Sequence, residues 1–137
     1  MPFQLLLFFF LYQLLTSGLE EPGWRGYALP KLQTKLSADR ASWRLGFLWA
    51  FWHYPFVIYL SYPAVTSPEN PIGIAVLIPT LAGFTMSIVG WTYVLTWVYN
   101  STRSVFLLIV LHAWVNVMNI YIIGAFRIRQ SRSTRRS

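Results

Sequence analysis

The sequence predicts an all-α membrane protein with about four transmembrane helices and one short interfacial helix. Of its 137 residues, 55% are hydrophobic and only 11% are charged, whereas roughly 25% of a soluble domain is charged. The apolar residues also gather in long runs, and most charged residues lie between these runs, which is typical of membrane spans. The absence of cysteine excludes disulfides, thiolate catalysis and cysteine-based zinc sites.

The first apolar run covers residues 3–15 and is interrupted only by Gln4, Tyr12 and Gln13. It lacks the basic start and the small-residue cleavage site of a signal peptide, so we expect a retained helix. A span needs about 20 residues, so this helix should continue toward Gly18. Ser17-x-x-Glu20 matches a capping box, and Pro22 suits a first helical turn. We therefore expect a kink or a restart between Ser17 and Pro22.

The segment from 26 to 36 carries Lys31 and Lys35 among leucine and tyrosine residues. This pattern predicts a short amphipathic helix in the membrane interface, broken at Pro30. A second span should cover residues 45–62. A proline-rich loop should follow at 63–71.

The third apolar run, residues 72–99, holds no charge. At about 1.5 Å per residue it would be about 40 Å long, more than the ~30 Å hydrocarbon core, so it should tilt or bend at Pro79. Gly83 and Ser87 form a small-xxx-small pair and Gly90 follows, which predicts a close contact with another helix.

A tight turn at 100–103 should lead into the fourth span, residues 104–126. On this span His112, Asn116 and Asn119 are spaced as one helical stripe. We expect residues 1–126 to form the transmembrane core. Residues 127–137 should form a basic, disordered tail.

Four alternating spans would place both histidines near one membrane surface. His53 and His112 each lie eight residues after the start of a span, or about 12 Å deep, and Glu20 and Glu21 end the first span at that surface. These groups should therefore share one polar pocket. Six basic residues in the loops on this side against five in the tail do not settle its orientation. We expect it to face the cytoplasm, because the interfacial lysines lie close to the bilayer.

The residue types in this pocket suit peptide-bond hydrolysis. A glutamate can act as general base on water, and a histidine and an asparagine one turn apart can form an oxyanion hole. Two alternatives stay open. Zinc could bind Glu20 or Glu21 with His53 and His112. The chain could also be a non-catalytic immunity or scaffolding protein, in which these residues only join helices. The net charge of +7 suits lipid headgroups, and we expect no nucleic-acid binding.

Three motifs occur in order on separate predicted helices: Glu20-Glu21-x-x-x-Arg25, Trp49-x-x-x-His53 and His112-x-x-x-Asn116. Together they resemble the CPBP family of intramembrane proteases, which includes the CAAX prenyl endopeptidases and the Abi bacteriocin-immunity proteins. The second motif usually begins with phenylalanine, and this chain has tryptophan there. Family members usually have about eight spans, so we expect this chain to represent the catalytic core without the upstream helices. Another chain could supply partner helices.

The resemblance implies specific roles for the site residues. Glu20 would be the general base, assisted by His53. His112 and Asn116 would hold the oxyanion. The supporting residues would be Glu21, Arg25 and Trp49. It also implies a metal-independent enzyme that acts on a membrane-associated peptide or a lipidated protein, with CAAX-type tails as one such substrate.

Overall fold

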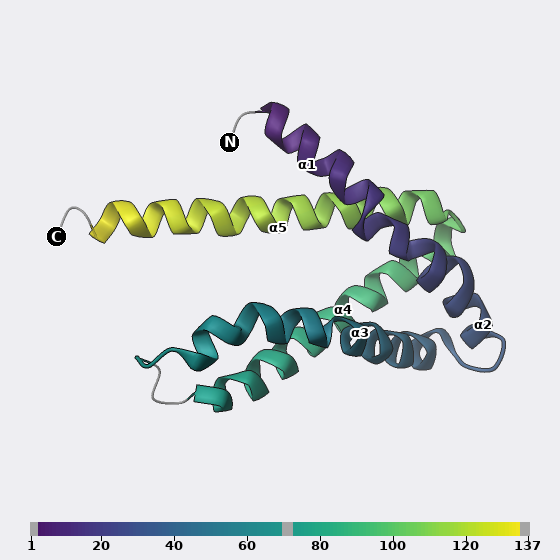
Figure 1. Cartoon of the computed structure of the whole chain (residues 1–137). Coiled ribbons are helices and arrows are strands. Elements are labelled where there is room, and N and C mark those ends of the chain that lie inside the picture. Colours follow the sequence, from purple (N-terminus) through teal and green to yellow (C-terminus); the bar gives the residue numbers. More distant parts are fainter. Residues whose placement is uncertain (1–2, 70–72, 135–137) are drawn as a thin grey trace. The chain divides into compact units, whose positions relative to one another are not determined.

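The computed structural model describes residues 3–69 and 73–134, and side chains for 4–69 and 73–122. The elements in chain order are α1 (Phe3–Leu15), a 3-10 turn η1 (Ser17–Glu20), a π-helix η2 (Pro22–Ala28), α2 (Leu29–Gln33), α3 (Ala38–Thr66), a 3-10 turn η3 (Gly73–Val76), α4 (Leu77–Thr102) and α5 (Val105–Thr134) (Figure 1). The described residues contain no strand. The predicted all-α fold is therefore confirmed.

Two segments of the described chain are long and apolar enough to cross a membrane, namely Gly73–Thr102 and Val105–Ile122. They correspond to the third and fourth expected spans. Helix α1 has 13 residues and therefore reaches only about 20 Å. Helix α3 has 29 residues, but its tryptophan, tyrosine, histidine and proline residues lower its hydropathy. The full number of spans stays a prediction.

The chain divides into two compact units, residues 1–26 with 103–137, and residues 27–102. In the first unit, α1 and η1 pack against α5. Residue numbers in the two segments run in opposite directions along this contact, because Gln13 meets Asn116 whereas Gly18 meets Ile109. The segments approach closely at Gly18, where an added Cβ would lie 2.8 Å from Ile109 Cγ2. Buried apolar side chains of α5 complete this core: Leu108, Ala113 and Val117.

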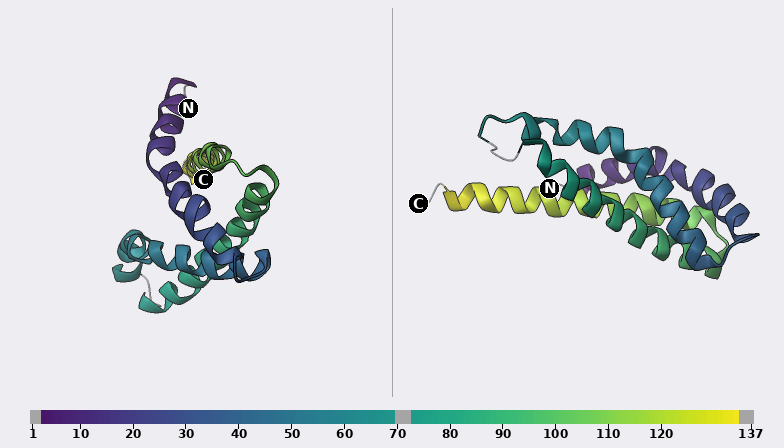
Figure 2. Two further views of the ribbon diagram at one scale, coloured as in Figure 1. Left: turned by 90° about the vertical axis from the view of Figure 1, so that its right-hand side faces the viewer. Right: turned by 90° about the horizontal axis from the view of Figure 1, so that it is seen from below.

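In the second unit, α3 packs along α4 (Figure 2). The two backbones lie close together at Gly46, where an added Cβ would lie 2.9 Å from Val89 Cα. By contrast, a Cβ on Gly83 or Gly90 would meet no atom within 4 Å, and Ser87 is exposed. The predicted close contact at these small residues of α4 is therefore wrong, because they lie on the side of α4 that faces away from α3.

The prolines act differently from what the sequence suggested. Helix α3 runs through Thr66 and contains both Pro55 and Pro63, so the helix extends into the expected loop. Pro30 lies at the start of α2, and Pro79 lies in the first turn of α4. For Pro79, the N–H that proline lacks would have no partner within α4. The helix α2 that contains Pro30 follows the π-helix η2 without a gap, so the predicted break at Pro30 is wrong. The tilt or bend of residues 72–99 stays a prediction.

Helix α4 continues to Thr102, so the turn into α5 is shorter than expected. Arg103 has a φ of 54°, and the Ser104 hydroxyl accepts a hydrogen bond from the Leu107 N–H at 3.2 Å, which caps the start of α5. At its other end α5 extends to Thr134. The backbone of the expected disordered tail is thus helical as far as Thr134, and residues 135–137 lie outside the described part.

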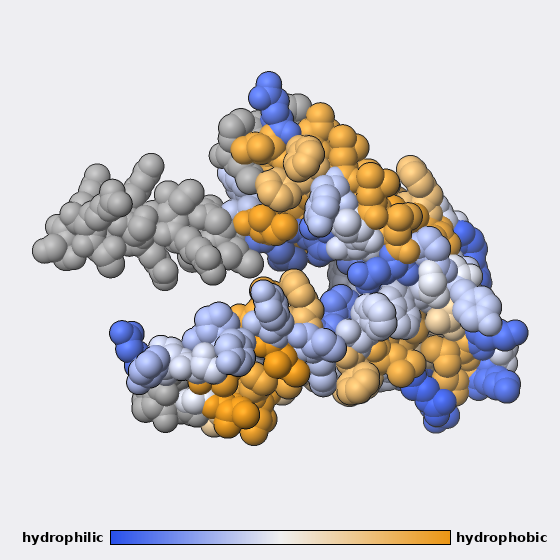
Figure 3. Space-filling view, viewed as in Figure 1, coloured by the Kyte–Doolittle hydropathy of each residue, from blue (hydrophilic) through white to orange (hydrophobic). Residues whose placement is uncertain are grey.

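Both units expose large apolar side chains (Figure 3). In the first unit Phe8 is 64% and Leu15 72% exposed, and in the second Ile78 is 75% and Trp97 71% exposed. Contiguous apolar surface of this kind is rare on soluble monomers and marks contact with a membrane or a partner. The exposed apolar surface therefore agrees with the two apolar segments, in α4 and α5, that are long enough to cross a membrane.

Candidate active site

The site in the first unit is built around Glu21, which lies between the 3-10 turn η1 and the π-helix η2. One turn later, Arg25 brings its guanidinium to Glu21 Oε1 at 3.0 Å. Both side chains are fully buried. Because a buried charge is costly unless it is paired, this ion pair is what allows both groups to remain in the interior. The Glu–Arg pair that the sequence spacing indicated is therefore present.

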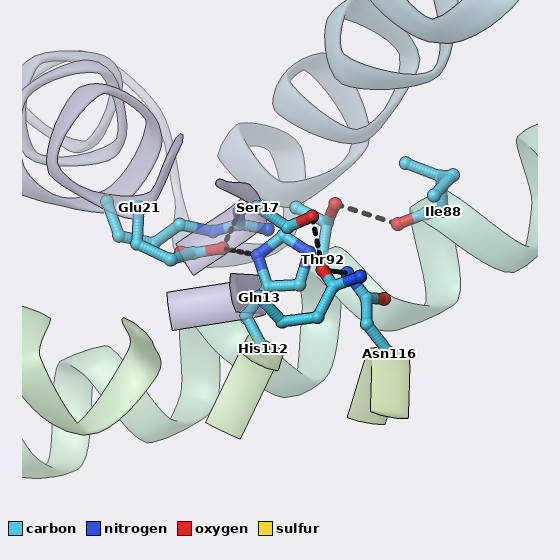
Figure 4. Close-up of polar contacts among 8 residues, drawn as sticks. Gln13, Ser17, Glu21, Ile88, Thr92, His112 and Asn116 are labelled. Carbon is cyan, nitrogen blue, oxygen red and sulfur yellow. Dashed lines mark hydrogen bonds and ion pairs between the residues drawn. The ribbon is translucent and has the colours of Figure 1, made fainter. Parts of the chain in front are cut away.

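His112 of α5 completes this centre, although it is 91 residues away in sequence. Its Nδ1 lies 2.8 Å from the same Glu21 Oε1 (Figure 4). A carboxylate oxygen can only accept, so Nδ1 carries a proton and donates it to Glu21. Oε1 thus accepts from both the guanidinium and the imidazole. The other oxygen, Oε2, is buried and has no hydrogen-bond partner among the described residues.

Asn116 follows His112 by one helical turn and is half-buried. Its Nδ2 donates to Gln13 Oε1 at 3.3 Å, and the Ser17 hydroxyl donates to the same oxygen at 2.8 Å (Figure 4). Asn119, the third residue of the predicted stripe, is exposed. Among the α5 side chains that the structure describes, residues 105–122, His112 and Asn116 are the polar ones with a hydrogen bond to the N-terminal segment.

Gln13 and Ser17 were not among the predicted site residues. The Ser17 hydroxyl bonds back to Gln13, and the N-cap position of η1 is Thr16, which makes no side-chain cap. The predicted capping box with Glu20 is therefore wrong. The sequence did contain one indication of these two residues. Both are polar, they are four residues apart beside an apolar run, and this spacing places them on one helix face.

Glu20 takes a different position from its neighbour Glu21. It is half-buried, and its negative charge acts on Arg25 in addition to that of Glu21. Of the two adjacent carboxylates, Glu21 is therefore the one in contact with His112. Glu20 lies at the edge of the same centre.

The remaining predicted residues, Trp49 and His53, lie together on α3 in the second unit. His53 Nδ1 is 2.8 Å from the Trp49 carbonyl oxygen, so the ring donates from Nδ1. The two rings are also in edge contact, with centroids 5.8 Å apart, and Trp49 is buried. Phe84 of α4 contacts the other side of the imidazole at 5.8 Å. Trp49 thus orients His53, while the approach of His53 to Glu20 stays a prediction.

Comparison with known proteins assigns this chain to a family. A family model described as type II CAAX prenyl endopeptidase Rce1-like matches residues 2–118. A CAAX prenyl protease 2 of Methanococcus maripaludis is 30% identical over 105 residues, which cover 76% of this chain and 36% of that protein. This match therefore spans about a third of the relative's length, and no solved structure matched the chain. Since the family model covers most of the sequence, including both halves of the Glu21–His112 contact, the chain belongs to the Rce1-like family of type II CAAX prenyl endopeptidases.

Proposed function

We propose that this chain is an intramembrane endopeptidase that hydrolyses a peptide bond near the C-terminus of a prenylated, CAAX-type substrate. Glu20 acts as general base on a water molecule, with His53 assisting. His112 and Asn116 stabilise the oxyanion of the tetrahedral intermediate. The name of the Methanococcus maripaludis relative, CAAX prenyl protease 2, supports this choice of substrate.

The observation that carries the proposal is the buried contact of His112 with Glu21. Because Nδ1 donates to Glu21, the second ring nitrogen, Nε2, points away from this carboxylate. To donate from Nε2 as well, the ring must carry both protons and a positive charge. The charges of Arg25, Glu21 and His112 would then add up to one positive charge, which attracts and stabilises the negative charge of the oxyanion. A preorganised donor of this kind contributes roughly 10²–10³ in rate.

Glu20 suits the role of base because it lies at the edge of the centre rather than in its interior. Glu21 Oε1 accepts from two donors in the interior, whereas Glu20 is half-buried at the edge of the centre. His53 suits the assisting role through its tautomer. Since Nδ1–H is held by the Trp49 carbonyl, Nε2 is the basic nitrogen of the neutral ring. It can accept a hydrogen bond from the attacking water.

We propose that the reaction needs no metal ion. The guanidinium of Arg25 and the imidazole of His112 bind the same oxygen of Glu21. The fixed positive charge of Arg25, so close to His112, would repel a dication bound there. The alternative is a zinc ion held by Glu20, His53 and His112. Metal analysis of the purified protein distinguishes the two mechanisms.

The substrate reaches the site from the bilayer in this proposal. The exposed apolar faces of both units suit lipid, and a prenyl chain partitions into the same medium. We propose a multi-pass protein of the cytoplasmic membrane, with the site opening to the cytoplasm. Partner helices from another chain could pack on the exposed faces.

The test is release of a C-terminal tripeptide. The full chain, reconstituted in lipid nanodiscs, is incubated with a synthetic peptide that carries a farnesylated cysteine three residues before its C-terminus. Mass spectrometry then follows the tripeptide. Glu20→Gln should abolish its release, whereas Glu69→Gln, the same replacement at an exposed loop position, should not change it. An unprenylated peptide should be cleaved more slowly.

Two results would contradict the proposal. If Glu20→Gln cleaves as fast as the wild type, Glu20 is not the base. If the wild-type protein releases no tripeptide while it still produces a biological effect in cells, the non-catalytic alternative is correct.

A further inference from the structure

We propose that Gln13 is a positioning residue that fixes the side-chain amide of Asn116 with a donor facing the substrate. This inference rests on the oxyanion role proposed for Asn116. Gln13 lies on α1 and Asn116 on α5, and the two are 103 residues apart in sequence. None of the three motifs that carry the family resemblance includes Gln13.

The orientation of the Gln13 amide is set by two donors. Its Oε1 accepts from Asn116 Nδ2 at 3.3 Å and from the Ser17 hydroxyl at 2.8 Å. If the amide were turned over, its NH₂ group would face the Asn116 NH₂ group and lose an acceptor for both donors. Ser17, one turn later on the chain, thus holds Gln13 in the orientation that accepts from Asn116.

This contact decides which end of the Asn116 amide is held against α1. Nδ2 carries two N–H groups, and one of them bonds to Gln13. The second N–H lies on the same nitrogen and can donate to an oxyanion. An amide rotated by about half a turn would instead present Oδ1, an acceptor that repels an oxyanion. Gln13 therefore selects the orientation of Asn116 that can stabilise negative charge.

A purely structural role would have different consequences. Hydrogen bonds between polar side chains join helices in membranes, and Gln13 could simply hold α1 on α5. In that case its loss would lower stability and would affect turnover whether or not Asn116 is present. If Gln13 acts through Asn116, its effect on turnover disappears once Asn116 is removed.

The experiment is a double-mutant cycle on turnover of the farnesylated peptide, with Gln13→Leu, Asn116→Ala and the double variant in nanodiscs. Gln4→Leu is the matched control, because it places the same replacement at an exposed position of the same helix. Gln13→Glu serves as a rescue variant, since its carboxylate can accept from the same two donors. The measured quantities are kcat, KM and the thermal unfolding midpoint.

We expect Gln13→Leu to lower kcat roughly tenfold, which corresponds to the net value of one hydrogen bond, with little change in KM. It should cause no further loss in the Asn116→Ala background. Gln13→Glu should keep most of the wild-type kcat, and Gln4→Leu should match the wild type.

The outcomes separate this inference from the proposed function. If Gln13→Leu lowers kcat equally in both backgrounds, or lowers only the unfolding midpoint, Gln13 is structural and the inference is wrong. The same holds if Asn116→Ala loses turnover while Gln13→Leu does not. If Asn116→Ala itself cleaves normally, the oxyanion role of Asn116 fails, and the inference fails with it.

Discussion

Replacing Gly18 with alanine tests whether the contact of η1 with α5 holds the Glu21–His112 pair together. An ideal Cβ at Gly18 would lie 2.8 Å from Ile109 Cγ2, 3.2 Å from the Ile109 carbonyl oxygen and 3.3 Å from the Gln13 carbonyl oxygen. Ile109 is β-branched, so its methyl group cannot turn away easily, and the other two atoms belong to the backbone. The added methyl group must therefore push η1 away from α5.

The size of this shift follows from the contact distances. Moving the Cβ from 2.8 Å to an ordinary contact of 3.4 Å requires a displacement of 0.6 Å. If the displacement is transmitted to Glu21, three residues later, its 2.8 Å bond to His112 lengthens to about 3.4 Å, beyond the usual limit of about 3.2 Å. We expect a loss of about 1–3 kcal/mol in stability from overpacking. We also expect turnover to fall by roughly ten- to a hundredfold, because ångström-scale misplacement of catalytic groups costs up to about 10².

Gly23→Ala is the matched control for Gly18→Ala. A Cβ at Gly23 would meet no atom within 4 Å, and alanine is favoured over glycine in a helix by up to about 1 kcal/mol. Thermal unfolding followed by tryptophan fluorescence and tripeptide release should therefore separate the two variants, with only Gly18→Ala impaired. If both alanine variants unfold at the same temperature and cleave at the same rate, the close packing at Gly18 does not position the site.

Three further predictions concern charge, packing and metal. Glu21→Gln leaves the Arg25 guanidinium buried without its counter-ion, so it should lower the free energy of unfolding by about 3–5 kcal/mol and reduce turnover; wild-type thermal stability would contradict the buried ion pair. Gly46→Ala should destabilise the second unit by about 1–3 kcal/mol because its Cβ would lie 2.9 Å from Val89 Cα, while Gly90→Ala, in open space, should not lower the unfolding midpoint, and equal midpoints would count against the α3–α4 contact. EDTA or phenanthroline should not affect tripeptide release, whereas one zinc ion per chain, with activity lost on its removal and regained on its return, would establish the metalloprotease alternative.

The sequence predicted those parts of the site that depend on helical spacing. Glu21 and Arg25 are four residues apart, as are His112 and Asn116, and side chains at this spacing share a helix face in any context. The helical fold was predicted from the long apolar runs. These relations are local, so they hold before the packing of the helices is known.

Relations between helices could not be predicted in the same way. The sequence identified Gly83 and Gly90 as candidates for a close helix contact, but Gly46 makes the contact in the second unit. A small residue allows close approach, but its presence does not tell which face of a helix meets a neighbour. Gln13 was missed for the same reason, because its contact with Asn116 depends on the register that Gly18 sets between η1 and α5.

The different roles proposed for Glu20 and Glu21 depend on which of the two carboxylates faces the interior, and the sequence alone does not show this. Successive residues of a helix differ by about 100–120° in direction, so the two adjacent side chains leave the backbone in different directions, although both charges act on Arg25. In the structure the interior position belongs to Glu21, whose Oε1 accepts from Arg25 and His112, and Glu20 is left half-buried. This arrangement supports the proposed mechanism, in which Glu21 orients the oxyanion donor His112 and Glu20 activates water.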